Sequence, residues 1–289
     1  NNVEMPRSSG YTTALRNIGS IRNSGFELQL DGRIIDRAVK WDLGVNFSLN
    51  RSKVLVLSED KDIFGGELDN TILKDQLNLM RVGEPMYVFY GYVEDGYDEN
   101  GHIVYKNMDD DPAITAADKT IIGDPNPDFL VNLTTAVSYK GFTLSAFFQS
   151  SIGNDIYSLS MAAQAYDYGY NGNTLREVYY NHWTPENPTA KYPNLDQTSY
   201  KMSDRFVYDG SFVRLKNLEL AYDVPCARSK FIKRARVYVS AQNLFTITSY
   251  PFWDPDINAN GGGSSMIQGV DSYCYPSART YTIGCRLTF

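Results

Sequence analysis

The sequence is poor in the residues from which disulfide frameworks and metal sites are built. It has three cysteines (Cys226, Cys274 and Cys285), too widely spaced for a metal motif and unable all to pair, and two histidines. It also lacks a GxSxG, Walker or dinucleotide-binding fingerprint. We therefore expect no disulfide framework and no enzymatic activity.

An excess of basic residues and long apolar runs are missing as well. The chain carries 27 Lys and Arg against 34 Asp and Glu, a net charge of −7, so we expect no nucleic-acid partner. No apolar run approaches the roughly 20 residues that a transmembrane helix needs. A membrane β-barrel is not excluded by the lack of long apolar runs, because each of its strands needs only about 10 residues of alternating hydrophobicity.

Alternation of apolar and polar residues is the dominant pattern. Because successive side chains of a strand point to opposite faces, each alternating run predicts a strand with one apolar and one polar face. A phase slip near Lys216 and Asn217 indicates a β-bulge. The pattern predicts seven strands, at 26–34, 41–50, 129–139, 142–149, 212–222, 235–246 and 281–289.

The connections between these runs alternate in length. They are short within pairs of runs and long between pairs, at about 51–126, 151–210 and 247–278. Short turns on one rim and long loops on the other are typical of outer-membrane barrels. We predict an all-β chain, a transmembrane antiparallel β-barrel over 21–289 that follows the end of an outer loop at 1–20. A soluble β-sandwich with one face on a core gives the same alternation and is the alternative.

The number of predicted strands indicates whether this chain could close a barrel by itself. Single-chain outer-membrane barrels use an even number of strands, with eight as the minimum. Open edges leave backbone groups unpaired in lipid, which is costly. Seven strands, and a start at Asn1 without an initiator Met, lead us to expect the C-terminal portion of a larger barrel.

Several segments also resemble a known family. They are NIGSIRNSGFELQL, GEPMYVFYGYVEDGYDENG, IIGDPNPDF, WTPENPTAKYPNL, DGSFVRLKNLELAYDVP, VYVSAQNLFTITSY and the terminal YPSARTYTIGCRLTF. From about Asn17 to Phe289 the chain resembles the SusC/RagA family, TonB-dependent nutrient transporters of the outer membrane of Bacteroidetes. The resemblance implies a 22-stranded barrel with an N-terminal plug, of which this chain supplies the last seven strands.

The resemblance also implies a function and partners. It implies active import of oligosaccharides or peptides, with a SusD-like surface lipoprotein, outer-membrane lipid and the remainder of the barrel and plug as partners. The TonB complex is contacted through an N-terminal part that nothing in this sequence matches. The alternatives are a passive porin-like channel and a soluble secreted carbohydrate-binding β-sandwich, which would bury the apolar face from Phe26 to Leu30.

An acidic stretch is a candidate Ca²⁺ loop. Calcium loops of the EF-hand type take oxygen ligands at positions 1, 3, 5, 7 and 12. The residues at those positions are Asn107, Asp109, Asp111, Ala113 (through its carbonyl) and Asp118. The SusC-like family often carries Asp at the first position and Gly where Pro112 stands here. The alternative is a solvated acidic loop.

Aromatic residues in two long connections are candidate substrate contacts, since aromatic faces stack on sugar rings and carboxylates accept their hydroxyls. They are Tyr166, Tyr168, Trp183, Tyr250, Phe252, Trp253 and Asp254, and packing within the loops is the alternative. The alternating C-terminal residues resemble the signal that the barrel assembly machinery reads, or simply end a strand. These are Tyr281, Ile283, Cys285, Leu287 and Phe289.

Overall fold

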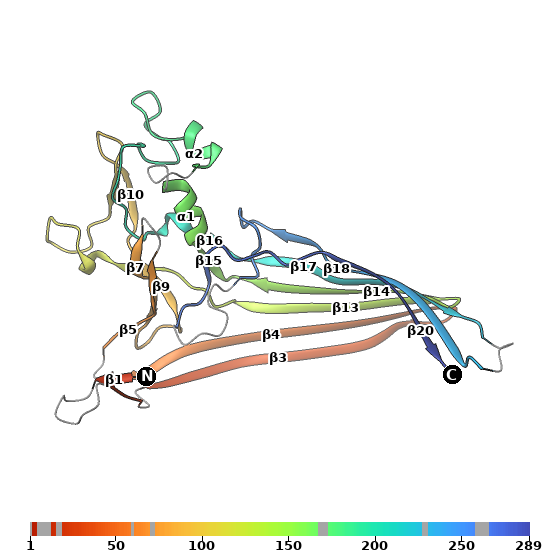
Figure 1. Ribbon diagram of the computed structural model, residues 1–289. Helices are drawn as coiled ribbons and strands as arrows, with labels where there is room; N and C mark the ends of the chain where they lie inside the picture. Colours follow the sequence, from red (N-terminus) through yellow and green to blue (C-terminus); the bar gives the residue numbers. More distant parts are fainter. Residues whose placement is uncertain are drawn as a thin grey trace.

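The computed structural model has two regions (Figure 1). A long sheet, here called the wall, extends from a cluster of short strands and helices, here called the head, which the long connections form at one end. The residues that the structure describes are 2–4, 13–15, 19–58, 61–69, 73–166, 173–226, 231–257 and 266–289.

The wall is one antiparallel sheet of seven strands, in the order β20-β18-β17-β14-β13-β4-β3. All seven predicted strands are confirmed, and β3 and β4 extend well beyond their predicted ends toward the head. The strands are β3 (Gly19–Asp36), β4 (Val39–Leu57), β13 (Phe129–Tyr139), β14 (Phe142–Ile152), β17 (Phe212–Val224), β18 (Arg234–Thr248) and β20 (Thr280–Thr288).

Local backbone features agree with the sequence. The turn between β13 and β14 has positive φ at both Lys140 (47°) and Gly141 (86°), as in the type I′ turns that match the twist of a hairpin. The predicted bulge is confirmed, because the register between β14 and β17 passes from Phe147–Asn217 directly to Phe148–Leu215 and leaves Lys216 as the extra residue of β17.

The strand register joins residues of one kind across the wall. One row on the apolar face passes through Leu30, Val45, Leu133, Phe148 and Leu215. The neighbouring row on the opposite face passes through Gln29, Asn46, Asn132, Gln149 and Arg214. The wall therefore has one continuous apolar face and one continuous polar face.

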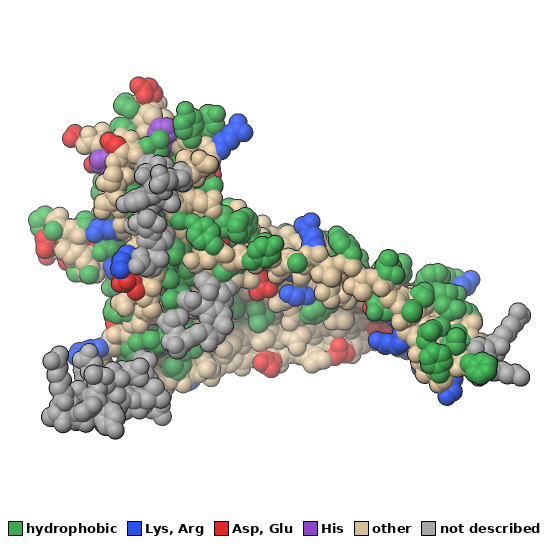
Figure 2. Space-filling model, in the orientation of Figure 1, with side chains coloured by type: hydrophobic (Ala, Val, Ile, Leu, Met, Phe, Trp, Pro, Cys, Tyr) green, Lys and Arg blue, Asp and Glu red, His purple; other side chains and the backbone are tan. Residues whose placement is uncertain are grey.

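No second layer covers the apolar face within the described residues. Phe26 and Leu30 are 58% and 59% exposed, and Figure 2 shows hydrophobic side chains on the surface along the wall. The sandwich alternative, which required this face to be buried, is wrong. Ion pairs lie on the polar face, such as Arg33 to Asp42 (2.8 Å) and Arg236 to Glu219 (3.3 Å).

The head consists of short elements from all three long connections. Its small sheets are β12-β9-β8-β5, β16-β15-β19, β10-β11 and β6-β7, and β1 (Asn2–Glu4) pairs with β2 (Thr13–Leu15) near the chain start. Its strands are β5 (Ile63–Phe64), β6 (Glu67–Asp69), β7 (Lys74–Gln76), β8 (Asn78–Met80), β9 (Val88–Gly91), β10 (Glu94–Tyr97), β11 (Ile103–Tyr105), β12 (Thr120–Gly123), β15 (Asp155–Ser158), β16 (Val207–Asp209) and β19 (Val270–Asp271). Its helices are α1 (Leu159–Tyr166), α2 (Arg176–Tyr180) and the 3₁₀ turns at Ala116–Asp118 and Asp204–Phe206. Among the described residues, no helix has the length and hydropathy of a membrane span.

One large hydrophobic core joins the three connections of the head, and a smaller cluster of Val54, Leu57 and Met80 lies where β4 enters it. Leu77 and Phe89 from the first connection, Tyr157 and Phe206 from the second and Val270 from the third are buried in one cluster. The long connections, which show no periodicity in the sequence, thus fold into one packed body because each supplies part of a shared core.

Candidate functional site

A buried arginine fixes the third connection to the wall. Arg214 of β17 is 1% exposed. It donates Nε–H to Thr246 Oγ1 (2.8 Å), Nη1–H to Ser277 Oγ (3.1 Å) and Nη2–H to the carboxylate of Asp254. Sequence reasoning missed Arg214, whose only signal is a polar side chain near the head end of a strand.

Asp254 completes this network. Its carboxylate also accepts the backbone N–H groups of Ser277 (2.8 Å) and Asp256 (2.9 Å). Burial opposes ionisation, but these backbone N–H groups and the Arg214 guanidinium outweigh it, so the pKa of Asp254 lies below its ordinary value. The oxygens of Asp254, predicted to contact substrate, are therefore occupied within the protein.

The other predicted aromatic residues of the third connection divide into buried and exposed. Tyr250 is buried, and its hydroxyl donates to Asp271 Oδ2 (2.6 Å) and lies 2.9 Å from Ser158 Oγ. Phe252 stacks on Trp253, with ring centroids 4.8 Å apart and an angle of 17° between planes. Trp253 is 57% exposed, so the Phe252–Trp253 pair presents an aromatic face at the surface.

The second connection uses most of its predicted aromatics for packing. Tyr166 is buried and stacks on Tyr200 with centroids 3.7 Å apart. The Trp183 ring lies over Gly101, where an added Cβ would come within 2.3 Å of it. Tyr168 lies outside the described residues. Substrate contact at these positions remains a prediction, and burial leaves the Tyr166 side chain no access to solvent.

A hollow lies between the head end of β18 and the segment 276–279. Its volume is about 350 Å³. It lies beside the Arg214 network, with the exposed Trp253 in its lining. The full lining is Arg214, Asn243, Phe245, Thr246, Thr248, Trp253, Asp254, Pro255, Pro276, Ser277 and Arg279.

The acidic loop is held by its own backbone. Asp118 Oδ1 and Oδ2 accept N–H groups from Met108 and Thr115, both at 2.7 Å. Asp109 and Asp111 accept from the backbone two residues further on, as in Asx turns. Across the described part of the chain, no three His, Cys, Asp or Glu side chains gather as metal ligands would.

This arrangement differs from the predicted Ca²⁺ loop. The carboxylates of Asp109, Asp111 and Asp118 serve separate turns, and the Asn107 side-chain amide donates to the Asp111 carbonyl (2.5 Å). Ala113 donates its own N–H to Asp111 Oδ1 (3.0 Å). The solvated acidic loop explains these contacts, and Ca²⁺ binding remains a prediction.

The first and second connections are joined by a second ion pair. Glu94 pairs with Arg205 and also accepts from Ser203 Oγ (2.7 Å). Both charged side chains are largely buried, so the pair cannot exchange its partners for water without a large cost. This pair therefore positions the two connections rather than presenting a free charge to a ligand.

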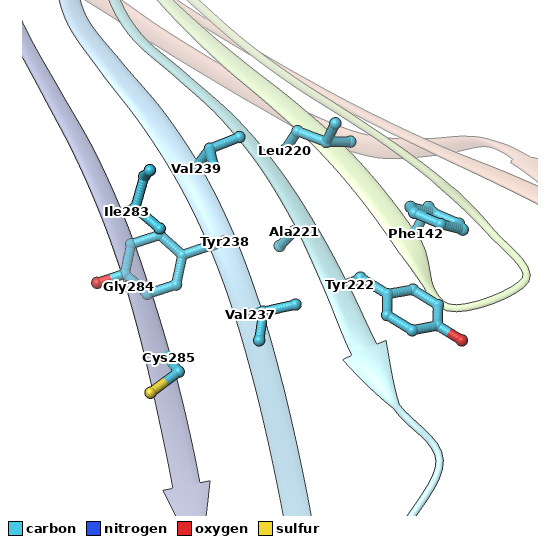
Figure 3. Close-up of a pocket in the computed structure, with 10 residues that line it drawn as sticks. All are labelled: Phe142, Leu220, Ala221, Tyr222, Val237, Tyr238, Val239, Ile283, Gly284 and Cys285. Atoms are coloured by element: carbon cyan, nitrogen blue, oxygen red, sulfur yellow. The ribbon is translucent and has the colours of Figure 1, made fainter.

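The C-terminal residues lie on the apolar face. Tyr281, Ile283, Leu287 and Phe289 are exposed hydrophobic residues, and Cys285 is exposed. Figure 3 shows an apolar hollow here that spans β14, β17, β18 and β20. By the strand register, the Tyr238 ring lies across Gly284 on the opposite face of the wall. Recognition of these residues by the assembly machinery remains a prediction.

Comparison with known proteins gives a consistent result. No family model matches the chain. It is 32% identical, over 99% of its length, to TonB-dependent receptor P3 of Formosa agariphila, and 28% identical, over its whole length, to TonB-dependent receptor SusC of Bacteroides thetaiotaomicron. Two solved structures of the RagAB peptide transporter cover 99% of the chain at 26% and 27% identity, with TM-scores of 0.79 and 0.80. The chain is SusC/RagA-like in sequence and in fold.

The SusC/RagA-like chain spans about a third of the proteins it matches. It covers 30% of receptor P3, 28% of SusC and 31–32% of the RagAB chains. The prediction of an antiparallel segment of a transmembrane β-barrel is confirmed by these structures. The matched proteins are named as receptors and transporters rather than enzymes, in agreement with the expected absence of catalysis.

Proposed function

We propose that this chain forms wall and outer loops of a TonB-dependent importer in the bacterial outer membrane, with oligosaccharides or peptides as substrates. One observation carries the proposal. A sheet with one apolar and one polar face bears all its long connections at one end, and it matches the RagAB transporter over nearly its whole length. Lipid on the apolar face and a polar lumen on the other explain this division.

The head then lies on the outer side of the membrane, where substrate arrives. A SusD-like lipoprotein is the proposed partner of the head, and the TonB complex and plug act through parts outside this chain. The tip of α2 fits a protein interface, because Tyr179 and Tyr180 are both exposed and Arg176 lies 5.5 Å from the Tyr180 ring centroid. Tyrosine and arginine are enriched among residues that dominate binding energy at interfaces.

Native purification tests the assembly. The receptor is extracted from outer membrane in mild detergent and the co-migrating proteins are identified by mass spectrometry. We expect a surface lipoprotein together with barrel and plug sequence. The double change Tyr179→Ala with Tyr180→Ala should reduce recovery of the lipoprotein, whereas Tyr275→Ala, exposed in the third connection, should not. A lone, water-soluble protein would contradict the proposal.

Energy coupling separates this function from the porin-like alternative. Uptake by an active importer stops when TonB is depleted, whereas a passive channel continues to conduct. We expect uptake of the substrate to fall to background on TonB depletion, with the receptor still present in the membrane.

A further inference from the structure

The hollow beside Trp253 lies where β18 extends beyond the end of its ladder with β20. The ladder between β18 and β20 stops at Gln242 and Thr280, while β18 continues to Thr248. Asn243, with a φ of +51°, lies in a bulge of β18, because it and Leu244 together face the single residue Lys216 of β17. Its side-chain amide donates to the Ala278 carbonyl (3.0 Å). This bond holds the segment 276–279 beside β18, beyond the end of the ladder between β18 and β20.

Two polar groups at this hollow lack partners within the described residues. The buried Asn243 Oδ1 accepts no hydrogen bond there, and the Arg279 side chain takes part in no ion pair or hydrogen bond with any of them. Arg214, in the same lining, is already engaged by Thr246, Ser277 and the carboxylates of Asp254 and Asp256. Among the residues that the structure describes, the hollow therefore has one uncommitted cation in its lining, Arg279, whereas burial shields Asn243 Oδ1 from a ligand.

The third feature is a fixed aromatic platform. Trp253 is more than half exposed, yet its ring is held by stacking on Phe252. The neighbouring Asp254 is locked by Arg214 and two backbone N–H groups, so the platform lies next to a rigid part of the wall. A preorganised surface of this kind loses little conformational entropy when a ligand binds.

These features specify the chemistry of a ligand. A guanidinium pairs best with a carboxylate, through two parallel hydrogen bonds. The π face of an indole attracts C–H groups. A uronate sugar carries a carboxylate, hydroxyls and a C–H face on one rigid ring. A peptide offers its carboxylates on flexible side chains or at its terminus, with no ring fixed beside them.

We propose that the hollow between Trp253 and Arg279 binds a uronate ring of an acidic oligosaccharide, with Arg279 pairing the carboxylate and Trp253 covering the ring. The inference rests on the proposed import function and narrows its substrate to acidic glycans.

Calorimetric titration of the full-length receptor in detergent tests it, with hexagalacturonate as the probe. Arg279→Gln should weaken binding about tenfold or more, because a hydrogen-bonded charge pair is lost. Trp253→Ala should weaken it by a similar factor. Arg286→Gln, which removes the same charge further along β20 and outside the hollow lining, should leave the affinity unchanged. Maltohexaose, a neutral hexasaccharide, should bind much more weakly than hexagalacturonate.

Three results would overturn the inference. They are equal affinity of the Arg279→Gln and wild-type receptors for hexagalacturonate, equal binding of maltohexaose, and Arg279-dependent binding of hexaglutamate in place of the saccharide. If uptake of another substrate still depends on TonB, only the assignment of the hollow fails. If uptake is independent of TonB, the proposed import function fails instead.

Discussion

The wall and the head solve the burial of apolar side chains in opposite ways. The head encloses its own core, with Leu77, Phe206 and Val270 almost completely removed from solvent. The wall is a single layer that leaves residues such as Leu30, Val239 and Ile283 uncovered. The head is thus built like a small water-soluble domain, whereas the wall depends on its surroundings to cover one face.

The strongest test of this comparison removes part of the head core. Phe206→Ala should destabilise the head by roughly 3–5 kcal/mol, since it empties a buried aromatic site. Tyr179→Ala, on the exposed surface of α2, should stay within about 0.5 kcal/mol. Limited proteolysis of the membrane-embedded receptor should then show cleavage in the head with the wall still protected. Simultaneous loss of both regions would show that they do not behave separately.

The second test places a charge on each face of one strand. Val239 and Ser240 are adjacent in β18 and lie on the apolar and polar faces. Val239→Arg should cost roughly 2–4 kcal/mol if the residue lies near the middle of the bilayer, and Ser240→Arg about 0–1 kcal/mol. The fraction of heat-modifiable, folded receptor on gels of outer membrane measures both. Equal yields would mean that lipid does not cover the apolar face.

The third test concerns a single contact within the head. Gly101 has a φ of +79° and lies under Trp183. Gly101→Ala should cost about 1–3 kcal/mol through backbone strain, and it should also displace the indole and change tryptophan emission. Gly96 has a φ of +96° but no atom within 4 Å of an added Cβ. Gly96→Ala should therefore produce strain without the spectral change.

The smallest expected effect is a pH dependence confined to the acidic loop. Backbone N–H groups of Met108 and Thr115 hold the pKa of the Asp118 carboxyl below its ordinary value of 3.8. Because the pKa of Asp118 is lower in the folded loop than in the unfolded chain, the ionised carboxylate stabilises the folded loop at pH values above the unfolded pKa. This stabilisation is lost as the pH falls through the folded pKa. Amide exchange should show reduced protection of residues 108–115 at pH 3 relative to pH 7. Asp118→Asn should lower the protection at pH 7, while Asp110→Asn, an exposed neighbour, should not.

The wall was predictable because its signal is local. Alternation follows from strand geometry alone, so runs such as Trp41 to Asn50 identify a strand without knowledge of its neighbours. Even the slip at Lys216 is visible, since an extra residue shifts every later side chain to the other face. The structure adds the length of β3 and β4 beyond the alternating runs.

The head was not predictable because its core joins distant segments. Nothing local links Leu77 to Val270, which lie in different connections yet share one cluster. The same limit explains the candidate site. An aromatic residue in a loop packs inward or faces outward with the same local sequence, so Tyr250 is buried while Trp253, three residues later, is exposed.

The two outermost strands of the wall have a consequence for handling the segment in isolation. Within the described residues, β3 and β20 each pair with a neighbour on one side only. Strand edges of this kind recruit other chains. Because the two edges differ in sequence, β20 of one copy meeting β3 of the next makes a head-to-tail contact that does not close on itself as a twofold dimer does. Expressed without the rest of the receptor, the segment should therefore polymerise, and light scattering during refolding should rise with concentration.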